Sequence, residues 1–184
     1  DMVYPNFEDH DYIRVKLDPK TLENIPKYAN KVSDDFLRQL LLTTLWDMVY
    51  YGEYSYKKYQ KTVQTTLKSE KNFIILDQLL NRITGRRSNS PGILYYSHFD
   101  PKPSKKDKKL LITNYEETIW KLLLKAKPGS ERQKILFNGF KNSVSSQKGL
   151  NDLIDILTGK RKLKTFPIDQ DKRWGIILKL VSYK

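Results

Sequence analysis

The residues that could do chemistry are few and widely spaced in this chain of 184 residues. A catalytic zinc site needs three protein ligands, and the helical pattern that supplies two of them is His-Glu-x-x-His. The sequence contains two histidines, His10 and His98, and neither belongs to such a pattern. Asp9, His10 and Asp11 come nearest to a ligand cluster, and we interpret them as solvated loop residues. No metal or catalytic residue is therefore predicted.

Nucleophilic and phosphate-binding patterns are also weak. Ser55 with Lys58, and Ser145 with Lys148, match the Ser-x-x-Lys pattern of penicillin-recognising enzymes. The Ser-Asp-Asn and Lys-Thr-Gly elements that accompany it are missing, so we interpret these serines as helix caps. Gly159 precedes a lysine but has no glycine five residues earlier, and no Gly-x-Gly-x-x-Gly occurs. The sequence therefore gives no support for nucleotide hydrolysis.

Basic residues are the strongest compositional signal. Lys and Arg number 34 against 21 Asp and Glu, a formal net charge of +13. They form three clusters: Arg86-Arg87, five lysines between Lys102 and Lys109, and Lys160, Arg161, Lys162 and Lys164. Such clusters, with Tyr95, Tyr96 and Phe99 near the second, could bind nucleic acid or an acidic protein partner. A solvated basic surface explains them equally well, and no nucleic-acid-binding motif is present, so a nucleic acid partner is not expected.

Composition excludes several other classes. The hydrophobic fraction of 39% with eight Gly and eight Pro is too apolar for a disordered chain. The absence of Cys excludes disulfide scaffolds and Cys-ligated metals, and it suits a reducing compartment, so we expect a cytoplasmic location. No apolar run approaches the roughly 20 residues that span a bilayer, so we expect a soluble protein without a membrane partner. Because the chain begins at Asp1, we expect it to be a piece of something longer.

Hydrophobic periodicity predicts the elements that must position these residues. Alternation from Tyr12 to Leu17 predicts a short β-strand that ends at Asp18-Pro19, so residues 1–32 form a strand and linker. Helical spacing begins after a cap at Ser33 or Asp34 and stops at Gly52. Further helices are predicted over about 55–67, 70–84, 113–126, 130–143, 150–157 and 169–181.

A long loop is predicted over about 86–113, because periodicity is lost there among Pro, Ser and Lys. Thr113 and Asn114, with Glu116 and Glu117 three residues after each, predict that the next helix starts with a capping box. The fold class is then all-α, with antiparallel helical hairpins stacked into a solenoid-like superhelix over residues 33–184 and preceded by the strand.

Three groups of residues resemble motifs of the aminopeptidase N family of zinc peptidases, in that family's order. The segment Pro5-Asn6 with Asp11 to Asp18 resembles the start of the family's C-terminal helical domain. Leu45-Trp46-Asp47-Met48-Val49, then Gly52-Glu53 and Tyr59, is similar to its "Leu-Trp-Asp-Met-Val…Gly-Glu…Tyr" helix and turn. Pro128-Gly129-Ser130 and the run from Asp169 to Trp174 resemble its "Pro-Gly-Ser" turn and "Asp-x-x-x-Arg-Trp" helix.

The resemblance implies a non-catalytic domain of a zinc aminopeptidase that releases N-terminal amino acids from peptides. The zinc-binding motif is absent from this chain, so zinc is implied only for the parent protein, and the chain alone is not expected to be an enzyme. Its implied partners are the catalytic domain of the same polypeptide and the parent's peptide substrates. The domain would cap the active site and control substrate access. Trp46, Asp47, Arg173 and Trp174 carry over only as structural residues. The two Trp are expected to pack between helices, and Asp47 and Arg173 are expected to anchor helix ends or to form ion pairs.

Overall fold

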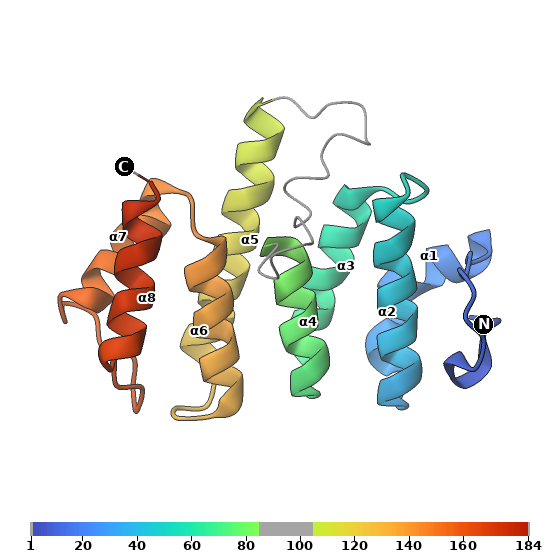
Figure 1. The fold of residues 1–184 in the computed structure, drawn as a ribbon, viewed down its shortest axis with the longest axis horizontal. Helices are drawn as coiled ribbons and strands as arrows, with labels where there is room; N and C mark the ends of the chain where they lie inside the picture. Colours follow the sequence, from blue (N-terminus) through green and yellow to red (C-terminus); the bar gives the residue numbers. More distant parts are fainter. Residues whose placement is uncertain (1, 85–104, 184) are drawn as a thin grey trace. The chain divides into compact units, whose positions relative to one another are not determined.

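The computed structural model describes residues 2–84 and 105–183 of a chain that divides into two compact units, Asp1–Pro103 and Ser104–Lys184. Every regular element in the described residues is a helix (Figure 1). The predicted all-α class is therefore confirmed, whereas the stacking of hairpins into a superhelix stays a prediction. His98, Arg86, Arg87 and most of the predicted loop lie outside the described residues.

The described residues of the first unit, 2–84, form four α-helices and two short 3₁₀ turns. In chain order these are η1 (Phe7–Asp9), α1 (Pro19–Tyr28), η2 (Ala29–Lys31), α2 (Asp35–Tyr50), α3 (Tyr56–Ser69) and α4 (Phe73–Thr84). Helix α3 contacts α1, α2 and α4, and it lies between α2 and α4 in Figure 1. Its apolar side chains consequently form the centre of this unit's core, with Tyr59, Val63 and Leu67 fully buried.

The strand predicted over residues 12–17 is wrong. Val15 and Leu17 are buried while Arg14 and Lys16 are exposed, so the predicted alternation of environment holds over these four residues. No strand is present in residues 2–84 or 105–183 to pair with this segment. Alternation reports which side chains are buried, but a strand also requires a hydrogen-bonded neighbour.

A helix replaces the linker that was predicted after this segment. Asp18 accepts hydrogen bonds from the backbone N–H of Lys20 at 2.9 Å and of Thr21 at 3.0 Å, which caps α1. Pro19 occupies the first turn, where its fixed φ suits a helix and its missing N–H leaves no donor unpaired. The Asp-Pro pair that we interpreted as the end of a strand is thus the start of a helix.

The predicted α2, α3 and α4 are confirmed with small shifts of their ends. Asp34, rather than Ser33, caps α2 by accepting from the N–H groups of Phe36 and Leu37. Ser55 stands at the N-cap position of α3, but its side chain makes no capping hydrogen bond. Asn72 caps α4, which begins at Phe73, through Oδ1 contacts to the N–H groups of Ile74 and Ile75.

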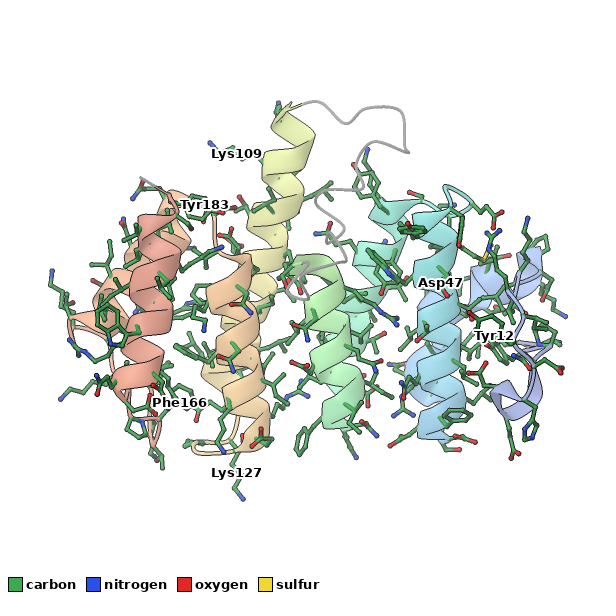
Figure 2. All side chains as sticks on the ribbon, in the orientation of Figure 1. Tyr12, Asp47, Lys109, Lys127, Phe166 and Tyr183 are labelled. Carbon is green, nitrogen blue, oxygen red and sulfur yellow. The ribbon has the colours of Figure 1, made fainter. Side chains whose placement is uncertain are left out.

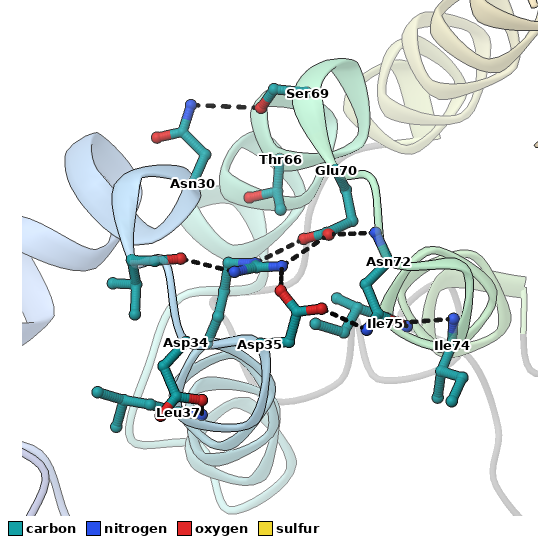
Figure 3. Close-up of polar contacts among 12 residues, drawn as sticks. Asn30, Asp34, Asp35, Leu37, Thr66, Ser69, Glu70, Asn72, Ile74 and Ile75 are labelled. Atoms are coloured by element: carbon teal, nitrogen blue, oxygen red, sulfur yellow. Dashed lines mark hydrogen bonds and ion pairs between the residues drawn. The ribbon is translucent and has the colours of Figure 1, made fainter.

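A buried ion pair fastens the turn between α3 and α4 to α2 (Figure 3). The Arg38 guanidinium donates from Nε to Glu70 Oε2 at 2.8 Å and from Nη2 to Glu70 Oε1 at 2.9 Å. Its Nη1 donates to the Val32 carbonyl at 2.6 Å, just before α2. The backbone N–H of Asn72 also donates to Glu70 Oε1, and the Asn72 amide reaches Asp35. The Glu70 carboxylate therefore connects the α3–α4 turn to α2 and, through Arg38, to the residues just before α2.

The second unit contains α5 (Lys105–Lys125), α6 (Glu131–Ser143), α7 (Gln147–Leu157) and α8 (Gln170–Val181). Helix α5 packs on α6, and α8 contacts α6 and α7. Figure 1 shows α6 and α8 in front of α5 and α7. The shared core contains large buried side chains: Tyr115, Ile119, Leu123, Leu136, Phe137, Phe140, Leu153 and Ile176.

Helix α5 starts earlier than predicted. It begins at Lys105, inside the predicted loop, so Thr113 and Asn114 lie within the helix and do not cap it. The first two turns are Lys-rich and carry Leu110, which is exposed, so little apolar periodicity marks them in sequence. Lysine is nevertheless a good helix former, which accounts for the extra turns.

The two tryptophans of the family motifs have opposite environments. Trp46 is 8% exposed and its ring lies 5.4 Å from that of Tyr59, as expected for packing between α2 and α3. Trp174 is 56% exposed, so the expectation that it packs between helices is wrong for the described chain. Helix α8 turns Ile176 to the core, and Trp174 lies on the opposite side together with Leu178 and Val181.

Candidate functional site

No metal site is formed by the described residues. Within 2–84 and 105–183, no group of three or more His, Cys, Asp or Glu side chains is placed to hold an ion. His10 is exposed, and its Nε2 lies 3.3 Å from the carboxylate of Glu8. The described parts of the chain also include no helix long and apolar enough to cross a membrane.

The Gly-Glu turn after α2 holds the N-terminal segment. Gly52 has a φ of +72°, a conformation that glycine adopts without strain, and it ends the helix. The Glu53 carboxylate accepts from Arg14 and, at 2.8 Å, from Lys16. The Arg14 guanidinium also lies 3.8 Å from the centre of the Tyr51 ring. These contacts place the motif's glutamate at a structural junction.

Asp47, labelled in Figure 2, lies on α2. Loss of solvent contact raises the pKa of Asp47, while the charges of Arg82 and Arg14 oppose that change. Part of the Asp47 surface remains exposed, and no ion pair within 4 Å joins it to a described cation. Arg82 is held instead by Thr43 Oγ1 at 3.0 Å and by the Leu42 carbonyl at 3.3 Å. Asp47 is thus a neighbour of cations, and pairing stays a prediction.

The motifs of the second unit cap helices. Ser130 accepts from the backbone N–H of Gln133 at 3.2 Å, and Gln133 Oε1 accepts from the N–H of Gly129 at 2.7 Å. This reciprocal arrangement is a variant of the capping box and explains the Pro-Gly-Ser turn. Asp169 caps α8 by accepting from the Lys172 N–H at 2.9 Å.

Arg173, in the first turn of α8, lies beside the end of α7. Its Nη1 donates to the Leu157 carbonyl at 3.4 Å. Leu157 is the last residue of α7, where carbonyls lack partners within the helix. A cation at this end also interacts favourably with the helix dipole. This contact supports the hypothesis that Arg173 anchors a helix end.

A second buried carboxylate, Glu116 of α5, accepts hydrogen bonds from the turn between α6 and α7. It is 3% exposed and accepts from the backbone N–H of Ser145 at 2.7 Å and of Ser146 at 3.1 Å, and from both serine hydroxyls. A Cβ on Gly149 would lie 2.9 Å from Glu116 Oε2, so glycine permits the close approach of α7. Burial lowers the pKa of the nearby Lys179 amine, and the charge of Glu116 opposes this effect.

Sequence reasoning missed Arg38, Glu70 and Glu116 as organising residues. In sequence, each looks like an ordinary charged residue of a helix or turn, and such residues are usually solvated. A weak signal did exist, because Arg38 and Glu116 occur beside apolar positions of their helices. The charged side chains of these three residues make hydrogen bonds that hold helices together, and none of the three lines a described pocket.

Comparison with known proteins agrees with the motifs. The sequence model of the family described as the ERAP1-like C-terminal domain matches residues 2–181. The chain is also 20% identical over 177 residues to aminopeptidase N of Streptomyces lividans, an alignment that covers 96% of this chain and 19% of that protein. The chain therefore spans about a fifth of the length of this relative. The resemblance predicted from the motifs is confirmed at the level of the family.

Acid should weaken the first unit through its paired carboxylates. Hydrogen bonds from Lys16 and then Arg14 lower the pKa of Glu53, and Asn72 and Arg38 likewise lower the pKa of Asp35. A lowered pKa stabilises the fold above the unfolded value of about 4, and this stabilisation is lost as the pH falls through the folded pKa. We expect urea unfolding to show lower stability at pH 3 than at pH 6, and Glu53→Gln to reduce that difference.

Asp152 provides the control for this experiment, because burial raises its pKa against the opposing charge of Arg161. Asp152→Asn should not reduce the loss of stability between pH 6 and pH 3. An unchanged loss in Glu53→Gln would show that the Glu53 contacts contribute nothing to acid sensitivity.

Proposed function

The chain belongs to the family of ERAP1-like C-terminal domains, and we propose that it is the non-catalytic C-terminal domain of a zinc-dependent aminopeptidase. The observation that carries this proposal is the family match over residues 2–181, combined with similarity to about a fifth of an aminopeptidase N. The parent protein would release N-terminal amino acids from peptides. Its catalytic domain would belong to the same polypeptide, and a cytoplasmic location stays a prediction.

The zinc of the parent would bind outside the described part of this chain. A catalytic zinc needs three protein ligands at about 2 Å, and residues 2–84 and 105–183 contain no cluster of suitable side chains. The residues present therefore do not fit the metal, and no step of zinc chemistry is assigned to them. The proposed contribution of this domain is to cap the active site and limit the access of peptides.

An exposed apolar stripe on α8 supports a docking role. Trp174, Leu178 and Val181 follow one another at helical spacing and are 56%, 68% and 58% exposed. Because Ile176 on the opposite side is fully buried, α8 is apolar on both sides, which is typical of a helix covered on both sides. We propose that the rest of the parent polypeptide covers this stripe, since the relative is about five times as long as the aligned chain.

The proposal predicts that the 184-residue chain does not hydrolyse amino-acid arylamides. Colour release by the pure chain should equal the rate without protein, both with and without added zinc, because the described residues contain no cluster suited to the metal. Turnover that scales with chain concentration and stops on chelation would contradict the assignment of a non-catalytic domain.

Substitution of the stripe separates docking from folding. Trp174→Ala with Leu178→Ala should change the unfolding free energy of the 184-residue chain little, because both side chains are largely exposed. In the longer polypeptide that carries this chain, the same pair should lower the thermal midpoint by several degrees, because buried apolar area is lost. Ile154→Ala on α7, also exposed, is the matched control. If the longer polypeptide has the same thermal midpoint with and without the two stripe substitutions, this stripe is not the docked surface.

A further inference from the structure

A pocket of about 620 Å³ opens in the second unit at the end of α7. The last turn of α7, the loop over residues 158–168 and Arg173 of α8 line it. Its accessible apolar side includes Leu157, Pro167 and Ile168, and its charged side consists of Arg161, Lys162 and Arg173. No Asp or Glu belongs to the described lining, so the pocket combines an apolar surface with positive charge.

The loop that forms this pocket is attached to the core at several points. Arg161 Nη2 lies 3.2 Å from Asp152 Oδ1, and its guanidinium is 5.2 Å from the centre of the Trp120 ring. The buried Gln133 donates to the Lys164 carbonyl at 3.3 Å. The rings of Phe166 and Phe137 lie 5.0 Å apart. The pocket is consequently formed in advance, and a ligand would not bear the free energy of ordering it.

The positive charge around the pocket is largely uncompensated. Lys160, Lys162 and Lys164 are exposed, and no described carboxylate lies within 4 Å of their amines. The whole unit from Ser104 to Lys184 has 19 Lys and Arg against eight Asp and Glu, so it carries +11 of the chain's +13. An anionic partner is therefore attracted to this unit and, within it, to a preformed pocket.

The C-terminal end of α7 would by itself disfavour an anion, but its carbonyls are already bonded. The N–H of Thr158 bonds to Ile154, that of Gly159 to Ile156 and that of Arg161 to Asp155. Arg173 donates to the remaining Leu157 carbonyl. The negative end of the helix is thus offset by backbone donors and a guanidinium.

We propose that this pocket binds an internal acidic segment of a partner protein that inserts one bulky apolar side chain among the cations. A protein segment fits better than nucleic acid, because Phe166, the aromatic residue of the described lining, is 6% exposed and offers little surface for base stacking. The apolar side chain would contact the accessible apolar lining of Leu157, Pro167 and Ile168, and carboxylates would pair with Lys162 and Arg173. The inference rests on the second unit alone and is independent of the proposed function.

The test uses the 184-residue chain and a fluorescent twelve-residue peptide of Asp and Glu with one central Phe, blocked at both ends so that only side chains carry charge. Fluorescence anisotropy at low salt should show saturable binding. Replacing the peptide's Phe by Ser should weaken binding about tenfold, because the pocket then removes no aromatic side chain from water. Equal affinity of the two peptides would overturn the proposal, and this comparison needs no protein variant.

Paired charge reversals on the protein separate the pocket from the general charge. Lys162→Glu with Lys164→Glu should weaken binding of the Phe peptide at least tenfold. The control pair, Lys106→Glu with Lys109→Glu, changes the net charge by the same amount. Lys109 lies at the other end of the unit from Phe166 (Figure 2), so the control pair should weaken binding of the Phe peptide less than threefold. Equal weakening by both pairs, or equal affinity for single-stranded DNA of the same charge, would overturn the assignment of an acidic protein segment.

Discussion

The first unit depends on a carboxylate that is almost completely withdrawn from water. Glu70 is 4% exposed, and an ionised group at such a position is tolerated only when its oxygens are paired. Arg38 pairs with both oxygens, and the same guanidinium holds the Val32 carbonyl. The entry to α2 and the turn between α3 and α4 must therefore keep one relative position. Glu116 has the corresponding role for the α6–α7 turn in the second unit.

Polar side chains of the described residues connect the helices of each unit. The most buried charged groups of the described chain hold helix ends, and the family motifs at Gly52-Glu53, Ser130 and Asp169 end, connect or begin helices. Two surfaces carry the proposed roles: the apolar stripe of α8 and the basic pocket beside α7. The proposed roles in docking and in partner binding depend on these surfaces.

The sequence predicts helices well where a cap and an apolar stripe coincide, as in α2 and α8, which begin after Asp34 and Asp169. Prediction from the sequence fails where the same residues can indicate two different structures. Asp18-Pro19 both ends an extended segment and starts a helix, so α1 was missed. The Arg38–Glu70 pair was not predictable because 32 residues separate partners that resemble surface residues. Trp174 lies on a helix with apolar residues on both sides, and only the structure shows that its side is exposed while the Ile176 side is buried.

We infer that pairing of Arg38 with Glu70, rather than the separate packing of either side chain, holds the first unit together. A double-mutant cycle with Arg38→Met and Glu70→Met, measured by urea unfolding, tests it most directly. Each single substitution leaves a buried charge unpaired and should cost about 3–5 kcal/mol, whereas the double variant should recover much of that loss. We expect a coupling energy of at least about 2 kcal/mol. Additive losses, with a coupling energy near zero, would contradict it.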